Sequence, residues 1–172
     1  DVLVKKYNVK ILKIIDELFV FDPKYFIPVC DGLIKRDYGL NIWAYARVDT
    51  IKEEYLDKLR RAGFKWLCLG IECGNSKVRE GICKGKFKES RIKNVVSKIK
   101  GSGINVIGNY MFGLPGDDLE SMQETLDLAR ELNCEFANFY STMAYPGSQL
   151  YKESIEKQID LPDSWLGFSQ HS

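Results

Sequence analysis

Short apolar segments alternate with longer segments of helical periodicity along the chain. The apolar segments are rich in β-branched and aromatic residues, which is typical of buried strands, and they cover residues 9–20, 40–49, 64–72, 104–116 and 134–147. Between and after them, apolar residues at helical spacing predict one helix beginning near residue 75 and others over about residues 23–35, 50–63, 88–100, 118–132 and 148–157. This alternation predicts parallel strands joined by right-handed crossover helices.

Turn and cap residues mark the limits of two helices. Pro23 suits the first turn of the helix over residues 23–35. Thr50 is placed to cap the next helix, Glu53 would complete a capping box, and Gly63 would end that helix. The sequence therefore predicts strand–helix units with short connections.

The strand segment "WLCLGI", residues 66–71, is apolar without alternation, as expected for a parallel strand that is covered on both faces. The fold class is therefore α/β, and the periodicity is compatible with both a doubly wound sheet and a barrel. No strand leads into a GxGxxG turn, and "GICKGKFK", residues 81–88, lacks the spacing and the hydroxyl of a P-loop. These absences argue against a cradle for a dinucleotide or a nucleoside triphosphate.

Composition and charge narrow the class of protein. The 172 residues, 45% hydrophobic and 28% charged, fit one globular domain with its own core. A net charge of +1 gives no reason to expect nucleic acid or a membrane surface as a partner. The apolar runs are too short to span a bilayer, and the first residues lack the pattern of a secretory signal. We expect a soluble, cytoplasmic protein.

The five cysteines are expected to be reduced thiols. Their odd number, in a domain of this size without a secretory signal, argues against a disulfide framework. No two cysteines have CxxC spacing, and the single histidine, His171, lies at the end of the sequence. A zinc site is therefore not expected.

Polar residues follow the predicted strands at their carboxyl ends, where parallel α/β folds collect functional groups. They are Asp16, Glu17, Arg47, Asp49, Glu72 and Asn109. An arginine can bind a carboxylate, acidic side chains can bind an ammonium group, and Glu72 can accept hydrogen bonds from sugar hydroxyls. The set predicts a site for a zwitterionic or hydroxyl-rich ligand. Two structural alternatives stay open: Glu72 caps the following helix, or Arg47 and Asp49 pair only with neighbours.

Four segments together resemble the corresponding segments of the radical S-adenosylmethionine (SAM) superfamily. They read "WAYARVDTIKEEYLDKLRRAG", "GIECGNSKVREGICKG", "MFGLPGDDLESMQETLDLA" and "AYPGSQLY". The resemblance extends over nearly the whole chain, and the ordered series is more specific than any single segment. It is greatest to the subgroup whose members often carry an N-terminal cobalamin-binding domain.

The resemblance implies part of a (β/α)6, TIM-like barrel in which the five predicted strands are the second to the sixth. Residues 1–158 would form this partial barrel. Residues 159–172 would be a C-terminal segment that leads to a further region.

The resemblance also implies which residues bind SAM. Asp16 would hold the methionine amino group, and residues 140–144 would line the adenine side. The carboxylate and the ribose would be bound by the ends of the next strands, with the implied residues being Tyr45 or Arg47, Glu72, Lys84 and, on the fifth strand, Asn109. In this interpretation Glu72 ends its strand because a ribose binds there. No catalytic residue and no metal ligand is assigned.

The sequence departs from the family pattern in two ways. Cys73 and Asn75 replace serines that are common in the motif around Glu72, although asparagine caps a helix equally well. The family's CxxxCxxC loop, whose thiolates hold a [4Fe–4S] cluster, is absent from the sequence. Cys68 and Cys73 cannot replace it, because one lies within a strand and their spacing does not wrap a cluster. We therefore expect the chain to be a piece of a longer parent protein that supplies the cluster ligands.

For that parent, the resemblance implies a radical enzyme. Its cluster would reduce SAM and cleave it to a 5′-deoxyadenosyl radical, which abstracts hydrogen from a small-molecule substrate, while the barrel binds and orients the cofactor. A reductant protein would be a partner, and the subgroup adds cobalamin as a candidate cofactor, with methyl transfer or ring closure as the outcome. The chain alone is expected to be inactive and to self-associate through exposed strand edges.

Two other functions are compatible with the residues alone. The first is a non-catalytic α/β barrel that binds a small zwitterionic ligand. The second is an ordinary barrel enzyme that uses Asp16, Glu17 and Glu72 as acid and base, with chemistry limited by the lack of a suitable histidine and of a metal cluster. A CxxxCxxC motif upstream in the parent gene would favour the radical enzyme over both.

Overall fold

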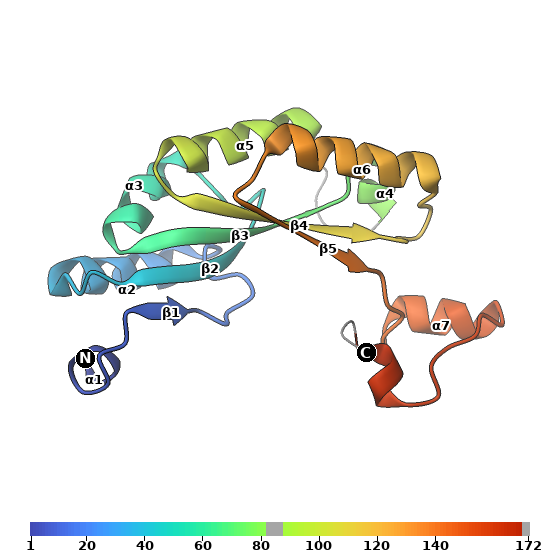
Figure 1. Cartoon of the computed structure of the whole chain (residues 1–172), viewed down its shortest axis with the longest axis horizontal. Coiled ribbons are helices and arrows are strands. Elements are labelled where there is room, and N and C mark those ends of the chain that lie inside the picture. The colour runs from blue at the N-terminus through green and yellow to red at the C-terminus, as the bar shows by residue number, and fades with distance from the viewer. Residues whose placement is uncertain (82–87, 170–172) are drawn as a thin grey trace.

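The strands form one five-stranded sheet in which all neighbours are parallel and follow one another in chain order. The structure, a computed structural model, describes residues 1–81 and 88–169 (Figure 1). The strands are β1 (Ile11–Lys13), β2 (Asn41–Arg47), β3 (Phe64–Glu72), β4 (Asn105–Phe112) and β5 (Phe136–Ser141). The sheet is curled and open, with β1 and β5 at its edges. The predicted α/β fold with a partial barrel is thereby confirmed.

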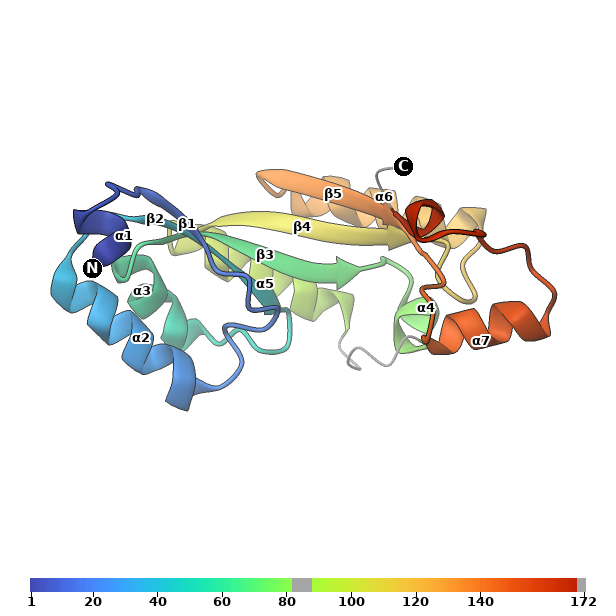
Figure 2. The same cartoon turned by 90° about the horizontal axis from the view of Figure 1, so that it is seen from below.

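The helices that connect the strands cover one face of this sheet (Figure 1). They are α2 (Pro23–Arg36), α3 (Glu53–Arg61), α5 (Glu89–Gly101) and α6 (Leu119–Leu132). Shorter helices lie at the ends of the sheet: α1 (Val2–Lys5), α4 (Ser76–Gly81), α7 (Gln149–Glu156) and a 3-10 helix (Trp165–Phe168). Figure 2 shows α7 beyond the carboxyl ends of β3 and β4. We call the sheet face turned away from the connecting helices the concave face.

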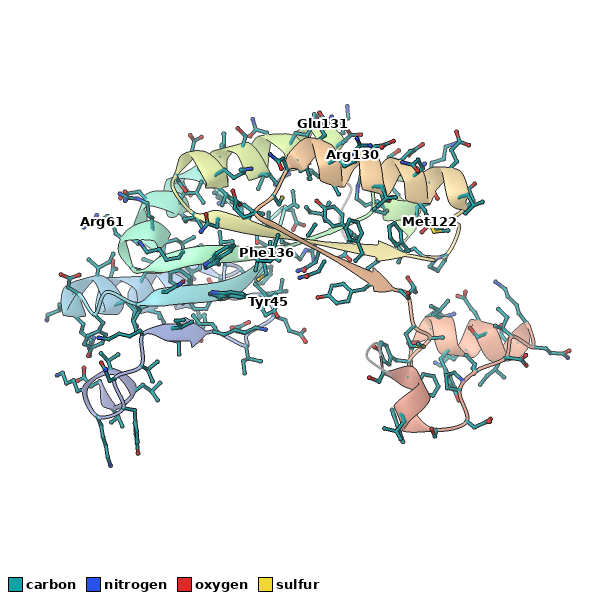
Figure 3. The ribbon with its side chains drawn as sticks, in the orientation of Figure 1. Tyr45, Arg61, Met122, Arg130, Glu131 and Phe136 are labelled. Atoms are coloured by element: carbon teal, nitrogen blue, oxygen red, sulfur yellow. The ribbon has the colours of Figure 1, made fainter. Side chains whose placement is uncertain are left out.

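Alternation along β2 shows how the sheet residues are divided between the two faces. Ile42, Ala44 and Ala46 are buried in the core between the sheet and the helices. The intervening residues are half-buried, and among them Tyr45 lies on the concave face (Figure 3). Burying one large aliphatic side chain contributes about 1.5–3 kcal/mol, so the core layer stabilises the helices on the sheet and leaves the concave face for other contacts.

The amino half of the concave face carries a row of aromatic rings. Trp43 and Trp66 are paired in register on β2 and β3, with ring centroids 5.6 Å apart. Phe136 of β5 continues the row, at 5.8 Å from the Trp66 ring. We call these three rings the aromatic floor. They cover the amino half of the concave face with apolar surface.

Both edge strands are much shorter than the predicted segments. Strand β5 covers Phe136–Ser141 of the predicted residues 134–147. Residues 9–20 were expected to be extended, but β1 pairs with β2 only from Ile11 to Lys13. The chain turns soon afterwards, where the Asp16 carboxylate accepts the Leu18 N–H at 2.9 Å. An edge strand has ladder bonds on one side alone, and local side-chain hydrogen bonds of this kind compete with its extension.

The predicted helix limits are confirmed at two positions and wrong at one. Helix α2 begins at Pro23, and Gly63 follows α3 with a φ of 100°. Thr50, however, does not cap α3, whose N-cap is Lys52 without a side-chain cap, and the predicted capping box is not formed. The Thr50 hydroxyl instead donates to the Arg47 carbonyl at 3.0 Å and closes the turn after β2.

The cysteines that the structure describes are free thiols, as predicted. Cys30, Cys68 and Cys73 are buried and Cys134 is half-buried. Cys83 and His171 lie outside the described residues. In residues 1–81 and 88–169, no helix has the length and the apolar character that crossing a membrane requires.

Strand β1 leads to a prediction about self-association. It is three residues long, pairs on one side with β2, and its Ile11 is 66% exposed. An open edge with apolar surface is a template for strand pairing, so we expect the isolated chain to self-associate at high concentration. Ile11→Lys should raise the dissociation constant roughly tenfold, because it places like charges close together across a strand pair formed by two chains.

Sedimentation equilibrium of the wild-type chain and the variant measures this effect. Ile159→Lys is the matched control, because Ile159 is 55% exposed and lies outside the sheet. This control should associate as the wild type does. A wild-type chain that remains monomeric at its highest soluble concentration would show that the β1 edge does not mediate self-association.

Candidate functional site

Strand register places polar residues side by side on the concave face, near the carboxyl ends of the strands. Arg47 of β2, Gly70 of β3, Asn109 of β4 and Asn138 of β5 lie in one row across the sheet. Within this row, Asn138 Nδ2 donates to Asn109 Oδ1 at 3.0 Å. The parallel topology thus gathers side chains that are far apart in the sequence.

A cavity of about 670 Å³ opens above this row. Four of the implied SAM ligands line it, namely Tyr45, Arg47, Glu72 and Asn109. Tyr140 of β5, within the segment expected on the adenine side, also lines the cavity. The volume lies within the range of about 300–1,000 Å³ that is usual for small-molecule sites. These four residues therefore share one cavity large enough for a nucleoside.

Two of the implied ligands are not placed in this cavity. The Asp16 side chain is not part of the lining, and its carboxylate is used by the Leu18 N–H. Its neighbour Glu17 lines the cavity instead. Lys84 lies outside the described residues. Of the two acidic residues that follow β1, Glu17 and not Asp16 thus lies at the cavity.

Strand β3 ends in a bulge beside the cavity. Gly70 pairs with Asn109 and Glu72 pairs with Tyr110, so β3 has one more residue than β4 over this stretch. A bulge re-aims the side chain that follows it, and bulges are frequent next to active sites. This bulge separates Glu72 from the regular alternation of the strand.

Glu72 then occupies the centre of a tight turn. The Cys73 N–H donates to the Ile71 carbonyl at 3.0 Å, and Glu72 between them has a φ of 70°. Three-residue turns with a positive central φ are rare and strained, and the left-handed conformation costs an L-residue about 1–2 kcal/mol. The strand therefore ends on a glutamate that is held in an unfavourable backbone conformation.

Gly70 makes room for the Glu72 carboxylate. A Cβ added to Gly70 would lie 2.8 Å from Glu72 Oε1, which is closer than real contacts allow. Any other residue at this position would displace the carboxylate. The side chain of Glu72 thus lies over Gly70, in the row of polar residues at the cavity, where it can accept hydrogen bonds from hydroxyl groups of a ligand.

The helix after β3 has its own cap. Asn75 Oδ1 accepts the N–H of Lys77 at 3.0 Å and that of Val78 at 3.1 Å. Asparagine is among the best N-cap residues. Asn75, and not Glu72, is therefore the residue that caps this helix.

The second structural alternative is present in the structure. Arg47 donates to Asp49 through two parallel hydrogen bonds, from Nε to Oδ1 at 2.9 Å and from Nη2 to Oδ2 at 2.6 Å. Both side chains are about one third exposed. Bidentate pairs of this kind are strong and fix the guanidinium plane. Arg47 therefore lines the cavity with part of its donor set already used.

Lys13, which the sequence pattern did not single out, lies close to Tyr45. Its Nζ lies 5.2 Å from the centre of the Tyr45 ring. A side-chain hydrogen bond with Tyr45 is the main cause that raises the pKa of Lys13 above its ordinary value. The signal in the sequence is a lysine within the apolar run "ILKII". Lys13 adds a positive charge next to Tyr45, which lines the cavity.

The described residues do not fit a metal cluster. They contain no group of three or more His, Cys, Asp or Glu side chains that could hold a metal ion. Burial raises the pKa of the Cys68 thiol and raises that of Cys73 to about 11. Thiolates are the form that binds iron, and these thiols stay protonated at neutral pH.

A second hollow of about 440 Å³ lies outside the concave face, between α4 and α6. Its lining includes Asn75, Pro115, Asp118 and Glu124, and none of the implied SAM ligands. Asp118 caps α6 there by accepting the Ser121 N–H at 2.8 Å. Its polar groups therefore serve the ends of the helices, and the cavity on the concave face is the better candidate site.

Comparison with known proteins gives a match to one family and to several relatives. The model of the Radical SAM superfamily matches residues 21–129. An uncharacterized methyltransferase of Pyrococcus horikoshii is 24% identical over 169 residues, covering 98% of this chain and 37% of the relative. An anaerobic magnesium-protoporphyrin IX monomethyl ester cyclase of Rubrivivax gelatinosus is 31% identical over 159 residues, covering 91% of this chain and 28% of the relative.

A solved structure has the same fold. It is the radical SAM methyltransferase TsrM of Kitasatospora setae with cobalamin and a [4Fe–4S] cluster bound, and it superimposes with a TM-score of 0.79 at 17% identity, over 90% of this chain and 32% of that one. The chain thus spans about one third of the length of the proteins that it matches.

Proposed function

Because the chain belongs to the radical SAM superfamily, we propose that its concave face binds S-adenosylmethionine as the cofactor-binding core of a larger radical enzyme. The observation that carries the proposal is the Glu72 carboxylate, which a bulge and a turn with a φ of 70° hold over Gly70 beside the cavity. Strained backbone persists at functional sites where the surroundings over-determine it. We assign this strain to recognition of the ribose hydroxyls.

The nucleoside half of SAM would be bound at the ends of β3, β4 and β5. Glu72 would accept hydrogen bonds from the ribose, and an ionised carboxylate is a strong acceptor for hydroxyl groups. Asn109 and Tyr140 line the same cavity on the next two strands and are proposed for the adenine side. The aromatic ring of Tyr140 offers the base an apolar surface as well as a phenol.

The methionine half would be bound at the ends of β1 and β2. Glu17 is proposed for the ammonium group in place of Asp16, because Glu17 lines the cavity and Asp16 does not. Tyr45 is proposed for the carboxylate, because its phenol can donate a hydrogen bond, while Asp49 occupies two donors of Arg47. Lys13, close to Tyr45, would add a positive charge near this group.

The [4Fe–4S] cluster of this family would be held by another part of the parent protein. The sequence contains no CxxxCxxC motif, and the described residues offer no metal-binding group. When bound, the cluster supplies the electron that cleaves SAM, and the residues of this chain bind and orient the cofactor. By this proposal the chain alone is inactive.

For the parent we propose methyl transfer or ring closure on a small-molecule substrate, with cobalamin as a second cofactor and a reductant protein as a partner. One relative is described as a methyltransferase and one as a cyclase, and the solved structure that shares the fold contains cobalamin. We propose the cytoplasm as its location, because the described cysteines are free thiols.

A rival function keeps the cavity but not the cofactor. The cavity has both acidic and basic side chains, with Glu17 and Glu72 on one hand and Arg47 on the other. This combination also suits a small zwitterion such as a free amino acid, bound by a non-catalytic barrel. The two functions differ in the part of the ligand that provides the affinity.

Titration of the chain with two fragments of SAM separates these functions. 5′-Methylthioadenosine keeps the ribose and the adenine, and methionine keeps the amino acid. We expect 5′-methylthioadenosine to bind with a dissociation constant of about 0.1–1 mM, worth about 4–5.5 kcal/mol, and methionine to bind more weakly. Isothermal titration calorimetry measures both. Binding of methionine without binding of 5′-methylthioadenosine would favour the zwitterion barrel and overturn the proposal.

A further inference from the structure

The segment that follows Glu72 is bonded to helix α6 through a buried pair. The Gly74 N–H donates to Thr125 Oγ1 at 2.9 Å, and the Thr125 hydroxyl donates in turn to the Ser121 carbonyl at 3.0 Å. Thr125 is fully buried. Water cannot replace the threonine oxygen at such a depth, so a residue without a hydroxyl would leave the Gly74 N–H unsatisfied.

Gly74 also packs directly on the backbone of α6. A Cβ at this position would lie 2.5 Å from the Glu124 carbonyl oxygen. On the solvent side, Asn75 Nδ2 donates to Glu124 Oε2 at 2.9 Å. The turn and the helix therefore approach as closely as a glycine permits, and the position of one fixes that of the other.

Arg79 binds the same turn from helix α4. Its Nη1 donates to the Cys73 carbonyl at 2.6 Å and to the Gly74 carbonyl at 3.1 Å. The side chain is 1% exposed and is among the largest fully buried side chains of the described residues. Arginine is almost never buried to this extent without specific partners. Here two of those partners are successive carbonyls of one short turn.

These contacts explain how Glu72 is kept at a positive φ. A positive φ is unfavourable for a glutamate, so it persists only where the residues on both sides are held in place. On one side is the paired strand β3, and on the other is the turn that Thr125 and Arg79 hold. We propose that Thr125 and Arg79 are positioning residues, which hold the Glu72 carboxylate in the geometry that binds the ribose. That the bound group is a ribose rests on the proposed function. That Thr125 and Arg79 hold the turn does not.

Amide hydrogen exchange of the chain, without any ligand, tests whether Thr125 holds the turn after Glu72. Thr125→Val has nearly the same shape and removes the acceptor of the Gly74 N–H together with the donor to the Ser121 carbonyl. If Thr125 holds the turn, exchange should become at least about tenfold faster at Gly74 and also at Cys73, whose N–H bonds to the Ile71 carbonyl and does not touch Thr125. Thr125→Ser keeps the hydroxyl and should restore both. Unchanged protection of the Cys73 amide in Thr125→Val would overturn the inference.

A matched control excludes general destabilisation. Leu132→Ala also removes buried contacts of α6, near its C-terminal end and away from the turn. At denaturant concentrations that give the two variants equal stability, exchange at Cys73 should be fast in Thr125→Val alone. Arg79→Met should accelerate the same amide, and Arg79→Lys should do so less, because lysine keeps a donor but not the fork.

Titration with 5′-methylthioadenosine tests whether the turn positions Glu72 for a ribose. Thr125→Val should weaken binding about tenfold, which is about 1.4 kcal/mol, whereas Thr125→Ser and Leu132→Ala should bind as the wild type does. If the wild type fails to bind, the proposed function is wrong and the exchange data still decide whether Thr125 holds the turn. If exchange accelerates while affinity stays constant, the turn does not position Glu72 for a ligand and the inference fails.

Discussion

Replacing Glu72 with alanine is expected to weaken S-adenosylmethionine binding about ten- to a hundredfold. The expected loss is about 1.5–3 kcal/mol, the range for a hydrogen bond to a charged group. The reason is structural: the carboxylate lies over Gly70 beside the cavity, and the helix that follows is capped by Asn75. Calorimetry of the parent enzyme with SAM, or of this chain with 5′-methylthioadenosine, measures the change.

Glu72→Gly separates the function of the side chain from the strain of the backbone. Glycine adopts a φ of 70° without penalty, so this variant should be about 1 kcal/mol more stable than Glu72→Ala and equally weak in binding. Glu54→Ala, at an exposed glutamate of α3, should match the wild type in affinity. If both Glu72 variants retain full affinity, the carboxylate does not bind the ribose.

Anaerobic reconstitution of this chain with iron and sulfide is expected to give no stoichiometric [4Fe–4S] cluster and no cleavage of SAM. The sequence has no CxxxCxxC motif, and the described residues have no metal-binding group. Burial also raises the pKa of Cys30 and of Cys73 to about 11, which keeps these thiols protonated. Iron and sulfide analysis, together with the electron paramagnetic resonance spectrum after reduction, measures the cluster content.

The parent protein supplies the control for this experiment. Reconstituted in the same way, it should hold one cluster and release 5′-deoxyadenosine from SAM. Cys73→Ala in the parent should leave the cluster content unchanged, because Cys73 is buried beside Val78 and Leu114. A stoichiometric cluster in this chain that disappears with Cys73→Ala would show that the assignment of the ligands to another segment is wrong.

Periodicity predicted the regular elements well, because most of them are decided by burial. The strand over residues 64–72 and the helix that starts at Pro23 lie where the pattern places them. Their apolar residues are covered by the same helices and strands that the alternation implies. Elements at the edge were predicted less well. Strand β1 is short because it has a neighbour on one side and little burial to extend it.

The candidate site was predicted in outline and not in geometry. Parallel topology brings Arg47, Glu72 and Asn109 to one cavity, so position at the end of a strand was enough to predict that they lie close together. The bulge at Gly70 and the positive φ of Glu72 are not encoded in any local pattern. The turn that follows Glu72 is bonded to Thr125, which lies far away in the sequence. Arg79, which donates to two carbonyls of the same turn, was not singled out from the sequence.

The aromatic floor has a consequence for how such a barrel can diversify. Trp43 and Trp66 precede the polar row by four residues along their strands, a rise of about 13 Å. The rings and the polar row thus lie on different parts of the same strands. The depth and the shape of this apolar part of the concave face can therefore change while the polar row at the cavity stays as it is. The two ends of the concave face can in this way vary in sequence independently of each other.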